Sequence, residues 1–267
     1  MNWNQLLSGK RFGMEEFHEE RQENRSEFQR DYDRLIFSAP FRRLQNKTQV
    51  FPLPGSVFVH NRLTHSLEVA SVGRSLGDDV AKALLERHPE LQDSFLPEIG
   101  SIVSAACLAH DLGNPPFGHS GEKAISTFFS EGKGVRLKEK QPNGEQLSPM
   151  EWEDLIHFEG NANAFRILTH QFEGRRKGGF VLTYTTLASI VKYPFSSSLA
   201  GTKSKFGFFV SEEESFRKIA TELGLILLNE HPLKYARHPL VYLVEAADDI
   251  CYQMMDIEDA YKLKILT

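Results

Sequence analysis

Residues 99–122 read IGSIVSAACLAHDLGNPPFGHSGE, an apolar run followed by a polar, turn-rich continuation. Apolar residues recur at helical spacing from Ile99 to Ala106 and predict a buried helix that arrives at His110. The next residues, LGNPPFGHS, hold two prolines and two glycines, which predicts a sharp turn. A helix end that opens on such a turn lets His110 and Asp111 converge on one ion, and imidazole with carboxylate suits divalent metals such as Mn, Fe, Co, Ni or Zn. A single His-Asp pair also occurs without a metal, so other parts of the chain must supply further ligands.

Two further stretches offer such ligands on helices of their own. His65 lies in NRLTHSLEVA, on an amphipathic helix predicted over residues 62–87, which ends before Pro89. Asp248 lies in LVYLVEAADDICY, within an apolar helix predicted from Pro239 to about residue 256. A carboxylate in an apolar helix is costly unless it is paired or bound to a metal. Three helices that carry His, His-Asp and Asp in this order fit a site in the core of a helical bundle.

The rest of the chain also favours an all-α fold with minor short strands. Helices are predicted over residues 120–131, 160–171, 184–192 and 212–229, and strands only over 48–51 and 180–183. Clusters of Gly, Pro, Ser and Lys predict loops at 52–56, 132–149, 174–179 and 194–207. None of these resembles a long interdomain linker. Residues 1–267 are therefore interpreted as a single domain with a charged N-terminal arm over about residues 1–35.

Composition limits the class of protein. With 267 residues, of which 40% are hydrophobic and 25% charged, the chain can bury a substantial core. A formal net charge of -5 argues against a dedicated nucleic-acid coat, so an anionic ligand requires a local cationic pocket. The two cysteines, Cys107 and Cys251, suit a reducing compartment. No apolar signal segment and no uninterrupted apolar run of about 18 residues occur, so we expect a cytoplasmic protein without a membrane span.

Most of the ten histidines need no special role. Surface or helix-capping positions are expected for His18, His60, His88, His170, His231 and His238. Cys107 lies one helical turn before His110 and is expected to be a small buried thiol rather than a zinc ligand, because no CxxC accompanies it.

Several motifs carry a family resemblance. RLTHS at 62–66, HDLGNPPFGHSGE at 110–122 and EAADDI at 245–250 together resemble the bacterial deoxyguanosine triphosphate triphosphohydrolases of the HD superfamily. FRRLQNKTQVF at 41–51 and HFEGNA at 157–162 add to the resemblance, which runs from about residue 30 to the end. It implies an HD-domain helical bundle with one divalent metal ion, Mn or Mg in the first place, held in its core by His65, His110, Asp111 and Asp248. It also implies a homo-oligomer, with a hexamer as the suggested number, and single-stranded DNA as a further partner.

His119 and Glu122 are the candidate catalytic pair. They lie three residues apart at the start of a predicted helix and therefore share a face. A carboxylate beside an imidazole raises its basicity and fixes its tautomer, which suits activation of water or protonation of a leaving oxygen. The two positions match the family's catalytic pair, and His157 matches a position near the triphosphate in relatives. Asn114 stands where some HD triphosphohydrolases carry a second histidine, which excludes proton transfer there and leaves a hydrogen bond to phosphate or water.

A triphosphate requires several cations. Arg62 lies three residues before His65, on the same helical face, and is predicted to hold a phosphate beside the metal. The resemblance implies a phosphate-binding lysine at Lys192, with Tyr193 beside it, and Lys205 is a further candidate on a predicted loop.

The sugar pocket is predicted on the helix that carries Asp248. Asp248, Tyr252 and Asp256 form one helical stripe. In that context Tyr252 is predicted to stack under a deoxyribose and Asp256 to accept a hydrogen bond from the 3′-hydroxyl. Gln49 matches the family's other sugar-binding position.

These residues predict hydrolysis of a deoxynucleoside triphosphate, with dGTP favoured, to the deoxynucleoside and inorganic triphosphate. The four metal ligands are equally compatible with another HD phosphohydrolase, such as a nucleotide phosphatase or phosphodiesterase, whereas the sugar-pocket residues argue against it. A nucleotide- or single-stranded-DNA-binding module without turnover is the third alternative, against which an intact His119 and Glu122 argue. The chain is shorter than usual family members, so we expect it to lack their C-terminal region and to be weakly active or poorly assembled alone.

Overall fold

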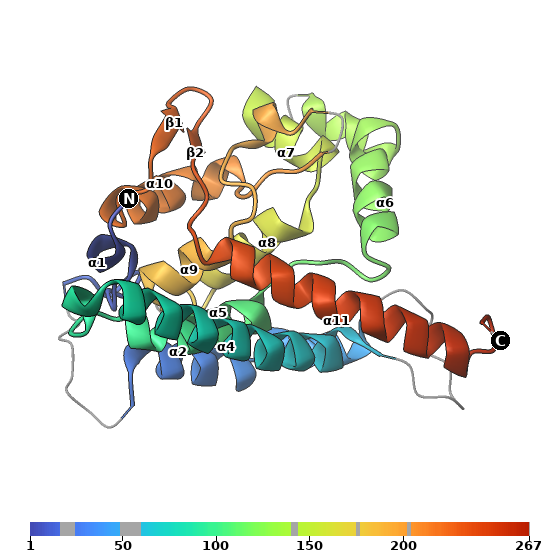
Figure 1. The fold of residues 1–267 in the computed structure, drawn as a ribbon. Helices are drawn as coiled ribbons and strands as arrows, with labels where there is room; N and C mark the ends of the chain where they lie inside the picture. Colours follow the sequence, from blue (N-terminus) through green and yellow to red (C-terminus); the bar gives the residue numbers. More distant parts are fainter. Residues whose placement is uncertain (17–24, 49–59, 140–143, 175–176, 202–203, 267) are drawn as a thin grey trace.

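The computed structural model describes residues 1–16, 25–48, 60–139, 144–174, 177–201 and 204–266. Helices dominate these residues, as the sequence predicts (Figure 1). The α-helices are α1 Trp3–Leu6, α2 Glu27–Ile36, α3 Ala39–Arg43, α4 Arg62–Arg87, α5 Ile99–Ala109, α6 His119–Ser130, α7 Pro149–Ile156, α8 Gly160–Thr169, α9 Tyr184–Ile190, α10 Glu213–Glu222 and α11 Val241–Lys262. Short 3-10 helices are η1 Leu44–Asn46, η2 Pro89–Leu91, η3 Leu96–Glu98, η4 Lys133–Lys138, η5 Ser197–Leu199 and η7 Val210–Glu212.

The centre of the fold is α5. Every residue of this helix from Ile99 to Ala109 is buried, which explains its uniformly apolar or small composition. It packs along α4 and also contacts α2, α9 and α11. Gly77 of α4 faces Gly100 of α5 so closely that a Cβ at Gly77 would lie 2.7 Å from the Gly100 Cα. The contact between α4 and α5 therefore depends on small residues.

Two long helices lie against this centre. The helix α4 begins with a capping box, in which the Asn61 side chain accepts from backbone N–H groups and the Thr64 hydroxyl accepts from the Asn61 N–H. It ends at Arg87, before Pro89, as the sequence predicts. Figure 1 shows α11 running beside α4, with α6, α7 and α8 above it. Contacts between α4 and α11 fix the two helices relative to each other.

Several predicted boundaries were wrong. The helix predicted over residues 212–229 ends at Glu222, because Gly224 turns the backbone to φ +65°. Leu227–Asn229 then forms β1, which pairs antiparallel with β2 at Lys234–Tyr235. The predicted loop at 132–149 contains η4, and α7 begins with a capping box at Ser148. The helix α11 continues six residues beyond residue 256, to Lys262.

The two predicted strands do not form in the described part of the chain. Thr183 makes one isolated bridge to Arg11, and Thr48 makes one to Asn61. The other residues of the segment predicted at 48–51 lie outside the described residues.

The N-terminal region also differs from the expected charged arm. Leu6 and Leu7 belong to the hydrophobic core. The buried Arg11 guanidinium donates to the Glu27 and Asp31 carboxylates, which both belong to α2. Within residues 1–16 and 25–35, the charged side chains therefore include a buried ion-pair cluster that anchors this region to the helical core.

Candidate active site

Four side chains predicted to bind metal converge from three helices. His65 Nε2 lies 2.9 Å from Asp248 Oδ1, which joins α4 to α11. His110 Nε2 lies 3.5 Å from the same Asp248 oxygen and 3.6 Å from Asp111 Oδ1. Single ligand atoms of His65, His110 and Asp111 all lie within 4.8 Å of one another. This spacing allows one cation to contact all of them.

The surroundings of the two His110 ring nitrogens show that this residue fits a divalent metal site. Its Nδ1 lies 2.6 Å from the Cys107 carbonyl oxygen, so Nδ1 carries a hydrogen and donates it. Its Nε2 is buried and has no partner of good hydrogen-bond geometry among the described residues. A histidine that binds a metal through one ring nitrogen usually donates a hydrogen bond from the other nitrogen to a carbonyl, as His110 does here. The Cys107 thiol itself is buried, as the sequence predicts.

Electrostatic attraction between the imidazoles and the carboxylates also stabilises this His/Asp cluster. Burial alone would lower the pKa of His110, but the Asp111 and Asp248 carboxylates raise it to about 9. Burial opposes ionisation of Asp248, yet His110 and His65 hold its pKa well below the usual range. A divalent cation would take the place of the imidazolium proton as the counter-charge to these carboxylates.

Arg62 and Asn114 both contact the Asp111 carboxylate. The Arg62 Nη1 donates to Asp111 Oδ2 at 2.6 Å, and both side chains are buried. The Asn114 amide donates to Asp111 Oδ1. In this structure the two residues that were predicted to hold phosphate therefore orient the carboxylate of Asp111, a predicted metal ligand, and both also line the adjacent cavity.

His119 and Glu122 form the predicted pair at the start of α6. His119 Nδ1 lies 2.8 Å from Glu122 Oε2, and Glu122 Oε1 accepts the Gly160 N–H at 2.8 Å. Burial would raise the pKa of Glu122, but the hydrogen bonds from His119 and Gly160 and the nearby Lys205 charge lower it. Glu122 is thus held as a carboxylate, while the His119 side chain is 85% exposed and free to meet a ligand.

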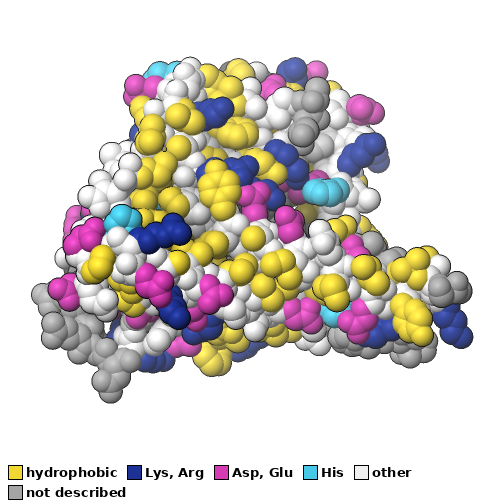
Figure 2. All heavy atoms as spheres, in the orientation of Figure 1, with side chains coloured by type: hydrophobic (Ala, Val, Ile, Leu, Met, Phe, Trp, Pro, Cys, Tyr) yellow, Lys and Arg dark blue, Asp and Glu magenta, His cyan; other side chains and the backbone are white. Residues whose placement is uncertain are grey.

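These groups surround one cavity of about 630 Å³. Figure 2 shows basic, acidic and histidine side chains gathered in a hollow between α11 and the helices above it. Among its lining residues are Arg62, His110, Asp111, Asn114, His119, Glu122, Lys192, Tyr193, Lys205, Asp248 and Tyr252. Most of the predicted site residues are therefore brought to one space. His65 lies behind them, fully buried against Asp248.

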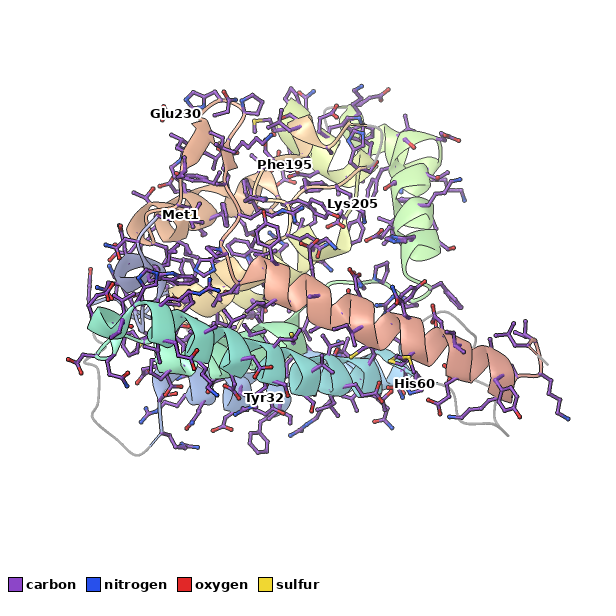
Figure 3. The ribbon with its side chains drawn as sticks, viewed as in Figure 1. Met1, Tyr32, His60, Phe195, Lys205 and Glu230 are labelled. Carbon is purple, nitrogen blue, oxygen red and sulfur yellow. The ribbon has the colours of Figure 1, made fainter. Side chains whose placement is uncertain are left out.

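Both predicted phosphate-binding lysines are held by glutamates. Lys192 Nζ lies 2.9 Å from Glu245 Oε1, and Lys205 Nζ lies 2.8 Å from Glu159 Oε1. Figure 3 shows Lys205 above α11, facing the space between α11 and α6. Glu159 is 1% exposed and also accepts from the N–H groups of the first turn of α8.

Sequence reasoning did not single out Glu159 or Glu245. Glu159 lies within the HFEGNA motif, immediately before a predicted helix, and this capping position was the available signal. Glu245 lies within EAADDI, three residues before Asp248, but nothing in the pattern paired it with Lys192.

The predicted sugar pocket is only partly assembled. Tyr252 lines the cavity and is 45% exposed. Asp256 is hydrogen-bonded to Tyr252, which raises the pKa of the tyrosine, but Asp256 is not among the lining residues. Gln49 lies outside the described residues.

His157 is also absent from the lining of this cavity. It ends α7, and its Nδ1 lies 3.2 Å from the Glu153 carbonyl oxygen. Two other histidines were expected at the surface or at caps but are buried. His60 Nδ1 contacts Asp259 Oδ1 at 2.8 Å beneath the far half of α11 (Figure 3), and His238 lies beside the Leu6 carbonyl.

Comparison with known proteins agrees with the geometry. Residues 62–176 match the family model of the HD domain. A Synechocystis protein named deoxyguanosinetriphosphate triphosphohydrolase-like protein is 46% identical to this chain over 275 residues. The alignment covers all of this chain and 61% of that protein. A Pseudomonas aeruginosa protein of the same name is 47% identical, with 58% of it covered. The chain is thus similar over its whole length to proteins named for deoxyguanosinetriphosphate triphosphohydrolase, and residues 62–176 match the HD domain.

A Yersinia enterocolitica protein named deoxyguanosinetriphosphate triphosphohydrolase is 36% identical over 301 residues, which cover all of this chain and 56% of that protein. The chain thus spans 56% to 61% of the length of these three relatives. The predicted family resemblance and the predicted helical fold are both confirmed. Among the described residues, no helix is both long enough and apolar enough to cross a membrane.

Proposed function

We propose that this chain hydrolyses a deoxynucleoside triphosphate, dGTP in the first place, to the deoxynucleoside and inorganic triphosphate with the help of one divalent metal ion. The observation that supports this most strongly is a single cavity that combines the His/Asp cluster, the His119–Glu122 pair and two lysines. The names of the relatives support a nucleoside triphosphate as the substrate class.

The metal would be held by His65, His110, Asp111 and Asp248, and Mn or Mg is proposed before Fe, Co, Ni or Zn. When bound, a divalent cation supplies Lewis-acid stabilisation of negative charge on phosphoryl oxygens. Arg62 contributes by fixing Asp111 beside it, as its 2.6 Å ion pair indicates.

Lys192 and Lys205 would bind the phosphates. Each is now paired with a glutamate, so a phosphate oxygen that enters the cavity must share or replace that partner. Both lysines line the cavity, and both side chains are partly exposed. Tyr193 lies beside Lys192, whose Nζ is 5.9 Å from the tyrosine ring centroid.

The proton transfer is proposed for His119. Water attacks the α-phosphorus, the bond from that phosphorus to the 5′-oxygen breaks, and the leaving oxygen takes up a proton. The His119 ring is held by Glu122 through Nδ1, which leaves Nε2 to move a proton at the reacting atoms. Such a His–Glu pair can either take a proton from the attacking water or give one to the leaving 5′-oxygen.

Sugar recognition is proposed for Tyr252, with Asp256 and Gln49 as further candidates. Tyr252 presents its ring to the cavity and its hydroxyl to Asp256. A ring under the deoxyribose would leave little room for a 2′-hydroxyl and so favour deoxynucleotides.

Three broader proposals follow from the family resemblance. We propose a homo-oligomer, with a hexamer as the suggested number and single-stranded DNA as a further partner, and a cytoplasmic location. Light scattering coupled to size-exclusion chromatography measures the first, and a fluorescent oligonucleotide titration measures the second.

The function is tested by incubating the chain with each of the four dNTPs and with GTP, in Mn or Mg, and separating the products by chromatography. We expect triphosphate and deoxyguanosine from dGTP, less product from GTP, and none from an Asp111→Ala variant. Absence of triphosphate from all five nucleotides, with a chain that is folded and binds Mn, would contradict the proposal.

A further inference from the structure

We propose that Lys47 is a positioning residue of the metal site, which holds the turn that carries Asp111 against the start of α4. The inference rests on the proposed metal site but concerns a residue outside the set that contacts metal or substrate. Lys47 is not among the residues that line the 630 Å³ cavity; together with Leu112 it lines a different cavity.

The Lys47 side chain binds the turn directly. Its Nζ donates to the Asn114 carbonyl at 2.7 Å and to the Leu112 carbonyl at 3.4 Å. These carbonyls follow the C-terminal end of α5, where the helix dipole and unpaired carbonyl groups favour a cation. The Lys47 ammonium therefore stabilises the carbonyl groups of this turn both by hydrogen bonds and by its positive charge.

The Lys47 backbone binds the other half of the site. Its carbonyl accepts the Arg62 N–H at 3.1 Å, at the first residue of α4. The Arg62 side chain then donates to Asp111, three residues before Asn114. Lys47, Arg62, Asp111 and Asn114 thus form a closed ring of contacts between the residues before α4 and the turn after α5. A shift of the turn cannot occur without breaking one of these contacts.

The opposite side of the turn is fixed independently. The Asn163 side-chain amide of α8 donates to the Gly113 carbonyl at 2.8 Å. Gly113 packs so closely on α8 that a Cβ there would lie 2.0 Å from the Gly160 carbonyl oxygen. Three successive carbonyls, of residues 112 to 114, are therefore each held by a side chain. Such a turn presents Asp111 to the metal in one orientation, and Lys47 supplies two of its three side-chain contacts.

The test is a Mn titration of the folded protein by calorimetry, which needs no turnover. Lys47→Met removes the donors and the charge but keeps most of the apolar stem. Loss of an outer partner of a metal ligand typically weakens metal binding by about 10–100-fold, and we expect a loss in that range. Lys47→Arg keeps a cationic donor and should recover most of the affinity. Lys82→Met, on the exposed face of α4, is the matched control and should bind Mn as the unaltered chain does.

Thermal unfolding without metal separates positioning from general stability. A purely structural lysine would lower the metal-free melting temperature and leave the Mn dissociation constant of the folded protein unchanged. If Lys47→Met does not fold, Lys47→Gln, which keeps an N–H donor without the charge, takes its place in the titration. A folded Lys47→Met or Lys47→Gln chain with an unchanged Mn dissociation constant would overturn the proposal.

The titration also separates this proposal from the proposed function. If the chain binds Mn but hydrolyses no dNTP, the activity proposal fails and the comparison of Lys47 variants still decides the positioning role. If the unaltered chain binds no Mn, both proposals are wrong.

Discussion

Asp248 Oδ1 lies 2.9 Å from His65 Nε2, although 183 residues separate the two in the sequence. The contact joins α11 to α4 at the wall of the cavity, where the His65 side chain is buried and the Asp248 side chain is partly exposed. His110, at the end of α5, contacts the same carboxylate oxygen. The helices α4, α5 and α11 therefore meet at one cluster of ionisable groups, and the proposed function requires this cluster to bind a divalent metal.

We expect Asp248→Ala to abolish tight metal binding. The substitution removes one proposed ligand and leaves His65 without its carboxylate partner. The Mn dissociation constant should rise by more than the roughly 10–100-fold that loss of an outer partner costs. Calorimetric titration measures this, and Asp249→Ala at the neighbouring exposed position is the control. Equal Mn affinity in Asp248→Ala and the unaltered chain would remove Asp248 from the ligand set.

His119→Ala should lower kcat and leave KM nearly unchanged. General acid–base catalysis contributes roughly 10²–10⁴-fold, and His119 is exposed and makes no core contact that the substitution would destroy. Glu122→Gln should have a smaller effect on kcat, because it weakens the hold on the ring without removing it. Steady-state kinetics on dGTP in saturating Mn decide the point. A His119→Ala chain with full kcat would exclude the proposed proton transfer.

Lys205→Ala and Lys192→Ala should mainly raise KM. A hydrogen bond to a charged group is worth about 1.5–3 kcal/mol, which corresponds to roughly 10–150-fold. Lys82→Ala serves as the surface control. If KM for dGTP and the affinity for inorganic triphosphate stay within twofold in both variants, the two lysines do not bind the phosphates.

His238 should make the fold less stable in mild acid. Burial lowers its pKa to about 4, with the Leu6 carbonyl hydrogen bond opposing the shift. The unfolded chain takes up a proton at its ordinary pKa of about 6.5, so the contribution to stability is complete above that pH and is lost as the pH falls from 6.5 towards 4.

Between pH 7.5 and 5.0 the loss from this group is about 2 kcal/mol. Urea unfolding at both pH values measures it, with His238→Gln as the comparison, since glutamine retains a donor for the Leu6 carbonyl. The unaltered chain should lose about 2 kcal/mol more than His238→Gln over this interval. Equal losses would show that His238 is not the responsible group.

Local signals in the sequence were sufficient for the helices that carry the site. Helical periodicity and Pro89 identify α4, and the apolar run before His110 identifies α5, because these signals act over a few residues. The helix predicted over 212–229 was wrong where Gly224 admits a left-handed backbone and the chain turns into a small sheet. A glycine inside a periodic pattern does not reveal which of these outcomes it produces.

The residues of the candidate site also fall into those that the sequence predicted and those that it did not. The motif residues were predictable because each carries a chemical type that suits metal or phosphate. Lys47, Glu159 and Glu245 were not, because each pairs with a group that lies 46 to 67 residues away in the sequence. Such partners become visible only when α4, α5, α8 and α11 are placed together.

The most direct test of the account is to hydrolyse dGTP in water enriched in oxygen-18 and follow the products by phosphorus NMR. Attack of water on the α-phosphorus should give a single phosphorus-containing product, inorganic triphosphate, with one oxygen-18 atom on a terminal phosphorus. The reaction should be absent from Asp111→Ala. Release of orthophosphate or pyrophosphate, or an unlabelled triphosphate with the label in the deoxyguanosine 5′-hydroxyl, would contradict the proposed reaction.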